Sequence, residues 1–187
     1  MGKYVTAAEA VQVVKSGDRV YVQAAAATPT ILTKALTDRA SELRNVELCH
    51  LHTEGDAPYA NPELAESFHV NSFFIGANVR HTLKAGNGSY TPVFLSELPL
   101  LFRKNVVKLD VAFIHVSPPD SHGYCSLGVS VEASVAAIEN AKIVVAQVNP
   151  QMPRTFGDGI LHVSEIDYLV DVNLPIYAHD VAPFTAE

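Results

Sequence analysis

The sequence contains no run of lysine or arginine residues, and acidic residues outnumber basic ones. Thirteen lysines and arginines stand against 20 aspartates and glutamates, which gives a formal net charge of −7. A chain of this sign lacks the positive field that draws the phosphates of a nucleic acid to a protein surface. The sequence therefore predicts no nucleic-acid partner.

Long hydrophobic runs are also missing. The longest apolar stretches, such as Val20–Ala27 and Ile143–Val148, fall well short of the roughly 20 residues that cross a bilayer. The first ten residues are not followed by the apolar segment that a secretory signal requires. We therefore expect no membrane segment and no signal peptide, and we expect the protein in the cytoplasm.

Cysteine is scarce, because Cys49 and Cys125 are the only two in the chain. Neither has a second cysteine at the spacing of a zinc site or of a redox pair. Free cysteine is among the most buried residue types in proteins. Both are therefore predicted to be small buried residues.

The sequence does contain enough apolar material for one hydrophobic core. Of its 187 residues, 48% are hydrophobic and 18% are charged, which is typical of a compact chain rather than a disordered one. Domains usually have roughly 100–200 residues, so residues 1–187 are interpreted as a single domain. The tail Pro175–Glu187 resembles a linker or a cut end.

Short apolar strands alternate with amphipathic helices along the chain. Thr6 and Glu9 form a capping box for a first helix that ends at Gly17, and Thr28 and Pro29 begin a second helix with Leu43 on its inward side. The other predicted elements are strands at Asp18–Ala24, Val46–Leu51, Phe68–Ile75, Leu109–Val116, Ala141–Val148 and Tyr168–Val172, and helices at Asn78–Lys84, Leu95–Arg103 and Val131–Asn140. This alternation indicates an α/β fold with a mainly parallel sheet layered with helices on both faces.

The loops that follow the strands are the candidate sites, because open parallel sheets bind ligands beyond the carboxyl ends of their strands. Four loops stand out: Ala24–Pro29, Gly86–Pro92, Ser117–Gly128 and Asn149–Gly159. The first either presents amides at a helix N-terminus to a ligand or is tight helix–sheet packing. The paired glycines of the second either allow close approach to a partner molecule or form a plain turn.

The other two loops carry polar side chains that also allow two interpretations each. His122 is either a proton carrier or, more commonly for such a residue, a surface histidine. Arg154 either pairs with a carboxylate or phosphate of a ligand or binds an acidic side chain of the domain, which is the commoner case. The polar loop up to Ser126 is costly to order unless it packs against something.

Metal and hydrolase chemistry find little support. His50, His52 and Glu54 share a face at strand spacing, which is geometrically possible for zinc. Two histidines on a strand are usually structural or pocket-lining, so no metal site is predicted. The sequence has no G-x-S-x-G motif, no phosphate-binding G-x-x-x-x-G-K motif and no G-x-G-x-x-G motif.

Several segments together resemble one family, the acetyl-CoA hydrolase/transferase group, which includes the 4-hydroxybutyrate and acetate CoA-transferases. They follow the family's order over nearly the whole chain. The matching segments are Ser16–Val20, the alanine-rich strand ending in Thr28–Pro29, Asn87–Pro92 with Leu95–Leu101, Asp110–Asp120, Gly123–Gly128 and Asn149–Asp167. The segments from Gly123 onward are the most specific.

The resemblance implies two related α/β domains of the CoA-transferase type, with the active site in the cleft between them. It implies ping-pong transfer of CoA between carboxylic acids, or acyl-CoA hydrolysis, through a glutamyl-CoA thioester. The catalytic glutamate of the family belongs to the second domain, which this chain lacks. Glu54 and Glu97 lie nearest to the candidate loops but match no nucleophile motif, so no catalytic residue is predicted in the chain.

For this half of the enzyme, the resemblance implies one wall of the cleft. The expected residues of the acyl pocket are Ala27, Thr28, Gly88, Ser89, Tyr90, Met152, Pro153 and Arg154. The expected partners are acyl-CoA, a small carboxylate and a carboxyl-terminal catalytic domain or subunit, with coenzyme A as a substrate rather than a bound cofactor. An uncovered interface between domains also predicts self-association into a homo-oligomer.

Several alternatives stay open at this point. The chain is a fragment of a longer enzyme, a natural subunit completed by a partner chain, or a binding or scaffolding domain that kept the fold and lost the chemistry. A sugar-phosphate isomerase would share the fold, but the family motifs disfavour it. Which acids are exchanged does not follow from the sequence, because both halves shape the pocket.

Overall fold

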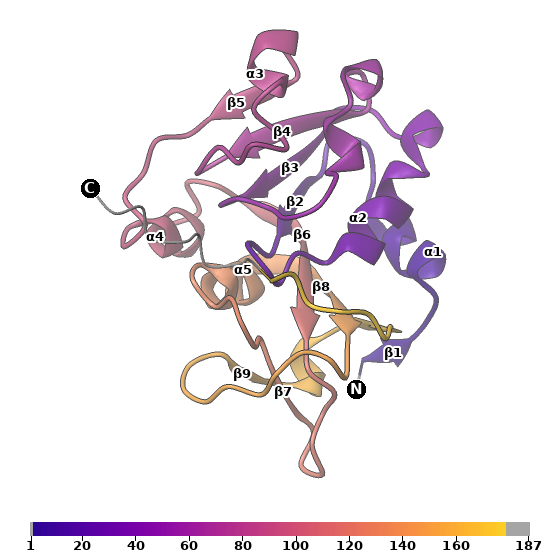
Figure 1. The fold of residues 1–187 in the computed structure, drawn as a ribbon, viewed down its shortest axis with the longest axis vertical. Coiled ribbons are helices and arrows are strands. Elements are labelled where there is room, and N and C mark those ends of the chain that lie inside the picture. The colour runs from indigo at the N-terminus through magenta and orange to yellow at the C-terminus, as the bar shows by residue number, and fades with distance from the viewer. Residues whose placement is uncertain (1, 179–187) are drawn as a thin grey trace, which may run out of the picture.

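The computed structural model describes residues 2–178 and is built around one eight-stranded sheet (Figure 1). All strands of this sheet run parallel, in the order β1-β10-β8-β6-β2-β3-β4-β5. They are β1 (Lys3–Tyr4), β2 (Arg19–Val22), β3 (Val46–His50), β4 (Phe68–Ser72), β5 (Gly88–Tyr90), β6 (Leu109–Val116), β8 (Ala141–Val148) and β10 (Tyr168–Asp171). The predicted α/β fold with a parallel sheet is confirmed.

Helices cover both faces of the sheet (Figure 1). They are α1 (Ala7–Ala10), α2 (Thr30–Thr37), α3 (Thr82–Ala85), α4 (Leu98–Arg103) and α5 (Ser134–Asn140), with 3₁₀ turns at Val11–Val13, Ala40–Glu42, Pro58–Ala60, Pro62–Leu64 and Val163–Glu165. Helices α1 and α2 pack on one face, and α4 and α5 pack on the other. Among residues 2–178, no helix is long and apolar enough to cross a membrane. The cytoplasmic location stays a prediction.

The two central strands explain why the sheet forms. Strands β6 and β8 lie beside each other, and their bounds are those that the apolar runs predict. Because side chains alternate along a strand, Val111 and Phe113 contact the α1–α2 layer, while Ala112 and Ile114 lie on the opposite face. Strands buried on both faces need apolar residues at nearly every position.

Short elements at the periphery differ from the predictions. Gly88–Tyr90 was expected in a loop but forms β5, which exists only through its pairing with β4. The polar loop after β6 contains β7 (Tyr124–Ser126), which pairs antiparallel with β9 (Ile160–His162). Two- and three-residue strands carry too few residues to show a period, so partners from distant segments decide them.

The helices are shorter than predicted, mainly at their starts. Helix α2 begins at Thr30 rather than Thr28 and ends before Leu43, and α4 begins at Leu98 without a cap from Ser96. Helix α3 keeps only the last turn of its predicted range before Gly86, and the start of α5 also lies later than predicted. The capping box of α1 is confirmed. Of the tail Pro175–Glu187, residues 179–187 lie outside the described residues.

Both cysteines are buried, as predicted. Cys49 and Cys125 are each 0% exposed, and neither forms a disulfide. Burial raises the pKa of the Cys125 thiol to about 11 and that of Cys49 further. Both thiols therefore stay protonated at neutral pH, which makes them poor nucleophiles.

Candidate functional site

The direction in which the chain adds strands to the sheet reverses between β2 and β6. From β2 the chain adds β3, β4 and β5 outward on one side, and it then returns to the other side of β2 to add β6, β8 and β10. Loops that leave the carboxyl ends of β2 and β6 therefore diverge, and such a switch point is where open α/β sheets bind ligands. The predicted loops after β2, β6 and β8 all begin at this edge of the sheet.

The loop after β2 is a tight turn under strain. Ala25 has a φ of +51°, a left-handed conformation that costs a residue with a Cβ on the order of 1–2 kcal/mol. Thr28 holds the turn, because its Oγ1 donates to the Ala25 carbonyl at 2.7 Å and accepts from the Glu54 amide at 3.0 Å. The Ala25 amide donates to the His52 carbonyl at 2.8 Å. The loops after β2 and β3 are thus cross-linked at the switch point.

A cavity of about 360 Å³ opens beside this cross-link, between α2 and the loop after β3. A second left-handed residue, Ala57 with a φ of +44°, shapes the loop. Gly55 lies directly against the Tyr177 hydroxyl, so no side chain fits at that position unless the tyrosine moves. The polar groups that line the cavity include Thr28, Thr30, Lys34, Glu54 and Asp56.

Directly after β2, the Gln23 side chain replaces backbone pairing between β2 and β6. Gln23 is fully buried, and its Oε1 accepts from the His115 amide at 2.6 Å. Its Nε2 donates to the carbonyls of Leu127 and Ser130, at 3.2 and 2.7 Å. The Gln23 amide still donates to the Phe113 carbonyl at 3.0 Å, so the side chain takes over only the next bond of the ladder. It also ties the loop after β6 to the sheet, while both ends of its amide stay satisfied.

On the opposite face of the sheet, Gln147 and His115 lie side by side on β8 and β6. They are 0% and 2% exposed. The Gln147 Oε1 accepts from the Ile31 amide at 3.1 Å, and its Nε2 lies 3.3 Å from the His115 Nε2. A side chain from the sheet thus caps α2, which has no side-chain cap from its own Pro29. The Ile31 amide at the start of α2 is therefore bonded within the chain.

Burial also sets the protonation state of this histidine. It lowers the pKa of His115 to about 4, although the backbones of Ala27 and Thr28 partly oppose the shift. His115 is therefore neutral at physiological pH, and only one of its two ring nitrogens carries a proton.

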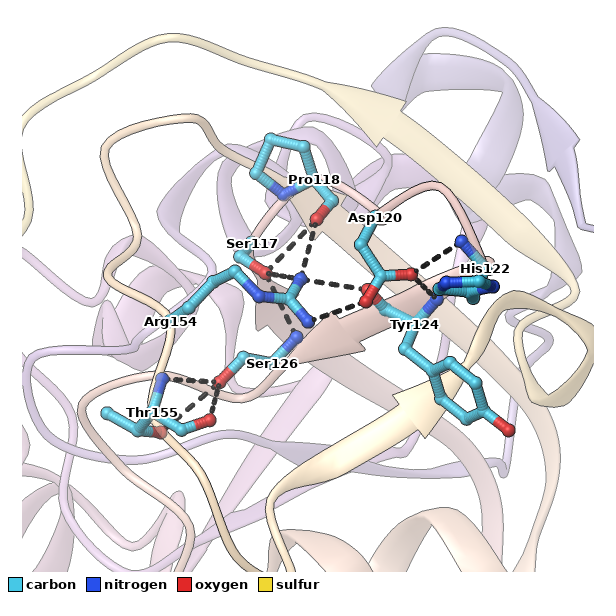
Figure 2. Close-up of polar contacts among 8 residues, drawn as sticks. All are labelled: Ser117, Pro118, Asp120, His122, Tyr124, Ser126, Arg154 and Thr155. Atoms are coloured by element: carbon cyan, nitrogen blue, oxygen red, sulfur yellow. Dashed lines mark hydrogen bonds and ion pairs between the residues drawn. The ribbon is translucent and has the colours of Figure 1, made fainter.

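The loop after β6 is ordered by Arg154 from the loop after β8 (Figure 2). The Arg154 Nη2 pairs with the Asp120 Oδ2 at 3.0 Å, and its Nη1 donates to the Tyr124 carbonyl at 2.9 Å. The amides of Tyr124 and His122 donate to the Asp120 carboxylate, and together with Arg154 they hold its pKa below the usual value. Arg154 thus binds an acidic side chain of its own domain, the commoner of its two predicted roles. His122 is exposed.

A second set of bonds joins the same two loops (Figure 2). The Ser126 Oγ accepts from the amides of Thr155 and Gly128, both at 3.1 Å. Gly128 has a φ of +65° and packs directly against Met152, which leaves no room for a Cβ. Met152 is 3% exposed, so it supports this loop from below, whereas its neighbour Pro153 is exposed.

The structure places the third predicted group, in β5, at the edge of the sheet. Three strand spacings separate β5 from β2, about 14 Å at ~4.8 Å per spacing. Gly88 packs against Thr82 of α3, so the close backbone approach predicted there is made to a helix. The Ser89 Oγ lies 3.0 Å from the His69 Nε2, and Tyr90 is 49% exposed. The eight predicted residues thus lie in three separate segments of the fold.

The histidines considered for a metal site contact different neighbours. The ring of His50 lies 6.1 Å from that of Tyr59, whereas His52 lies 5.9 Å from Phe74. Within residues 2–178, no three His, Cys, Asp or Glu side chains come together to hold a metal ion. His50 is fully buried, and burial lowers its pKa to about 4. It is a neutral core residue.

Gln23, His115 and Gln147 belong to no motif and were not predicted as site residues. Their signal in the sequence is a polar residue directly before the last residue of a strand whose middle is apolar, as in Leu109–Val116 and Ala141–Val148. A buried amide or imidazole has to find hydrogen-bond partners. Those partners come from loops whose positions only the fold defines.

Comparison with known proteins identifies the family. Residues 1–178 match the family described as the acetyl-CoA hydrolase/transferase N-terminal domain. The chain is 44% identical over 171 residues to the succinyl-CoA:acetate/propanoyl-CoA:succinate CoA transferase of Fasciola hepatica. This alignment covers 90% of this chain and 35% of that protein. It is 39% identical over 174 residues to the 4-hydroxybutyrate coenzyme A transferase of Clostridium kluyveri. That alignment covers 93% of this chain and 41% of the transferase.

Solved structures agree with this result. The chain superimposes on RipA from Yersinia pestis with a TM-score of 0.91 at 29% identity, covering 99% of this chain and 46% of that one. For the 4-hydroxybutyrate CoA-transferase of Porphyromonas gingivalis the TM-score is 0.80 at 33% identity, covering 98% and 42%. The chain therefore spans less than half the length of these relatives. It belongs to the acetyl-CoA hydrolase/transferase family, as the resemblance predicted, and corresponds to the N-terminal domain of that family.

Proposed function

We propose that this chain forms one wall of the active-site cleft of a CoA-transferase or acyl-CoA hydrolase that acts on small carboxylic acids. The observation that carries the proposal is the match of residues 1–178 to the N-terminal domain of a family whose curated members are CoA transferases more than twice as long. The strained turn and the cavity at the switch point lie where an open parallel sheet binds ligands. A single domain over residues 1–187 is part of the same proposal.

The nucleophile in this proposal is a glutamate outside the chain. Its carboxylate attacks the thioester carbonyl and expels the CoA thiolate, which leaves a mixed anhydride. The thiolate then attacks the glutamyl carbonyl of the anhydride, releases the first acid and forms the glutamyl-CoA thioester. The same steps in reverse load the second acid, or water discharges the thioester in a hydrolase. Coenzyme A takes part as a substrate.

The N-terminal domain contributes the shape of the acyl pocket. We assign the central contacts to Ala27 and Thr28, because they belong to the strained turn at the switch point and Thr28 also fixes the neighbouring loop through the Glu54 amide. The outer walls of the cleft are assigned to Ser89, Tyr90, Pro153 and Arg154. Gly88 and Met152 support these walls from behind, as their packing against Thr82 and Gly128 indicates.

An apolar surface at the ends of β4 and β5 is the proposed contact for the carboxyl-terminal domain or subunit. Phe74, Phe94 and Leu95 are 60%, 77% and 57% exposed. Phe74 and Leu95 line a hollow of about 320 Å³ together with Leu51, His52, Phe73, Val93 and Leu98. Clustered exposed aromatic side chains mark interaction sites, and the relatives have more than half of their length left to occupy one.

The experiment is an exchange assay with a covalent trap. The 187-residue chain alone is expected to show no CoA transfer between an acyl-CoA and acetate, and the full-length protein, or the chain mixed with its carboxyl-terminal half, is expected to show it. Trapping the thioester with borohydride and mapping the modified residue by mass spectrometry identifies the nucleophile. Turnover by the isolated chain, or a CoA adduct on one of its own residues, would overturn the proposal.

A further inference from the structure

His115 and Gln147 form a pair whose hydrogen-bond directions can be worked out in full. They are register partners on adjacent parallel strands and lie on the face of the sheet that α2 covers. The Ile31 amide can only donate, so the Gln147 atom that faces it at 3.1 Å is the oxygen. The Gln147 amide nitrogen therefore faces His115.

The direction of the Gln147 side chain fixes the tautomer of the imidazole. An amide NH₂ group is a donor only, so the His115 Nε2 at 3.3 Å is the acceptor and carries no proton. Because burial keeps the ring neutral, the single proton lies on Nδ1. The Ile31 amide thus determines, through one glutamine, which end of His115 donates.

The donating end lacks a well-formed hydrogen bond in the described structure. The His115 Nδ1 is buried and makes no hydrogen bond of ordinary geometry, although the backbones of Ala27 and Thr28 act on the ring as weak hydrogen-bond partners that raise its pKa. A buried donor without a well-formed hydrogen bond destabilises the folded state. Such a group in an otherwise satisfied network calls for a reason.

We propose that His115 is a positioning residue for the acyl pocket, whose Nδ1–H sets the position of the turn from Ala25 to Thr28 by donating to its backbone when substrate fills the pocket. The proposal rests on the function assigned above. The turn is strained at Ala25 and is bonded through Thr28 to the amide of Glu54. A small shift of the turn therefore moves both loops that face the acid.

Two conservative substitutions in the full-length enzyme separate the two ends of the ring. His115→Asn places an amide near Nδ1 and keeps a donor toward the turn, whereas His115→Gln places its amide near Nε2 and keeps a partner for Gln147. The readout is the concentration of carboxylate that half-saturates discharge of the preformed enzyme–CoA thioester. We expect His115→Gln to raise this concentration about tenfold or more, and His115→Asn to stay within about threefold of the wild type.

Two readouts separate positioning from a merely structural role. The thermal unfolding midpoints of the two variants should be similar to each other, so that a difference in carboxylate half-saturation reports positioning rather than stability. The wild-type dependence on carboxylate should also show no titration of His115 between pH 5.5 and 8, because its ring stays neutral there. Equal losses in the two variants, or no loss in either, would overturn the proposal.

A measurement that needs no turnover keeps this inference separate from the assigned function. In full-length protein labelled with ¹⁵N-histidine, we expect the His115 ring to show a protonated Nδ1 and a bare Nε2, and Gln147→Leu to abolish that preference. The opposite tautomer in the wild type would overturn the positioning role. Wild-type protein that shows the expected tautomer but transfers no CoA would instead remove the assigned function.

Discussion

At the scale of single residues, His50 is the least satisfied side chain of the core. It is fully buried against Tyr59, and neither ring nitrogen has a hydrogen-bond partner in the described structure. Burial lowers its pKa to about 4, so the folded state excludes a proton that the unfolded chain binds below about pH 6.5. Folding stability that depends on His50 is therefore complete above pH 6.5 and is lost as the pH falls toward 4.

Replacing the His50 imidazole should weaken the pH dependence of the free energy of unfolding below pH 6.5. The linkage amounts to at most about 3 kcal/mol at pH 4 for an imidazole shifted this far. We expect His50→Leu to remain folded, to gain about 1–2 kcal/mol at pH 5 and to lose part of the pH dependence between 6.5 and 4. Urea unfolding across that range measures it.

The matched control is His122→Gln, because His122 is exposed. It should leave the whole curve unchanged. A curve for His50→Leu that is as steep as the wild-type curve would show that His50 is not the source of the acid sensitivity.

At the scale of elements, the loop between β6 and β7 depends on one cation from another loop. Arg154 binds the Asp120 carboxylate and the Tyr124 carbonyl at the same time, and Asp120 in turn accepts from two amides of the loop. We expect Arg154→Met to speed hydrogen exchange at the amides of His122 and Tyr124 on the order of tenfold. Arg154→Lys, which keeps the charge but loses the fork, should have a smaller effect. Unchanged exchange in the Met variant would show that the loop is ordered by other contacts.

The sequence predicts the elements of the centre better than those of the edges. The bounds of β6 and β8 follow from their apolar runs, because a strand buried on both faces has an unmistakable composition. Strands β1, β5, β7 and β9 have two or three residues each, and pairing with distant segments decides them. The start of α2 shows the same limit, since Gln147 from β8 caps it rather than Thr28.

The candidate site was predictable in outline only. The switch-point turn at Ala27 and Thr28 was found because small residues follow a buried strand. The β5 group lies about 14 Å away across three strand spacings, a distance that depends on strand order, which the sequence pattern did not supply. The buried pair of His115 and Gln147 was missed because its meaning depends on register between β6 and β8.

At the scale of the whole molecule, the apolar surface at the ends of β4 and β5 should govern association. The isolated 187-residue chain is expected to self-associate through this surface, because Phe74, Phe94 and Leu95 are all more than half exposed. Light scattering over a concentration series measures the mass. The double substitution Phe94→Ser and Leu95→Ser should shift the chain toward monomer.

A second exposed aromatic residue provides the control for that experiment. Phe156 is 92% exposed in the loop after β8, away from β5 in the strand order. Phe156→Ser should leave the association unchanged if the surface at β4 and β5 is responsible. A wild-type chain that stays monomeric at high concentration would contradict the prediction.

Gln23 links the end of the central strand ladder to the loop after β6. Just beyond the last register pair of β2 and β6, the Gln23 amide bonds to the Phe113 carbonyl, but the His115 amide bonds to the Gln23 side chain instead of its backbone. The same side chain donates to the carbonyls of Leu127 and Ser130, so one residue holds both the end of the ladder and the loop after β6. A substitution of Gln23 should therefore loosen the strand ends and the loop together, whereas substitutions elsewhere in that loop spare the ladder.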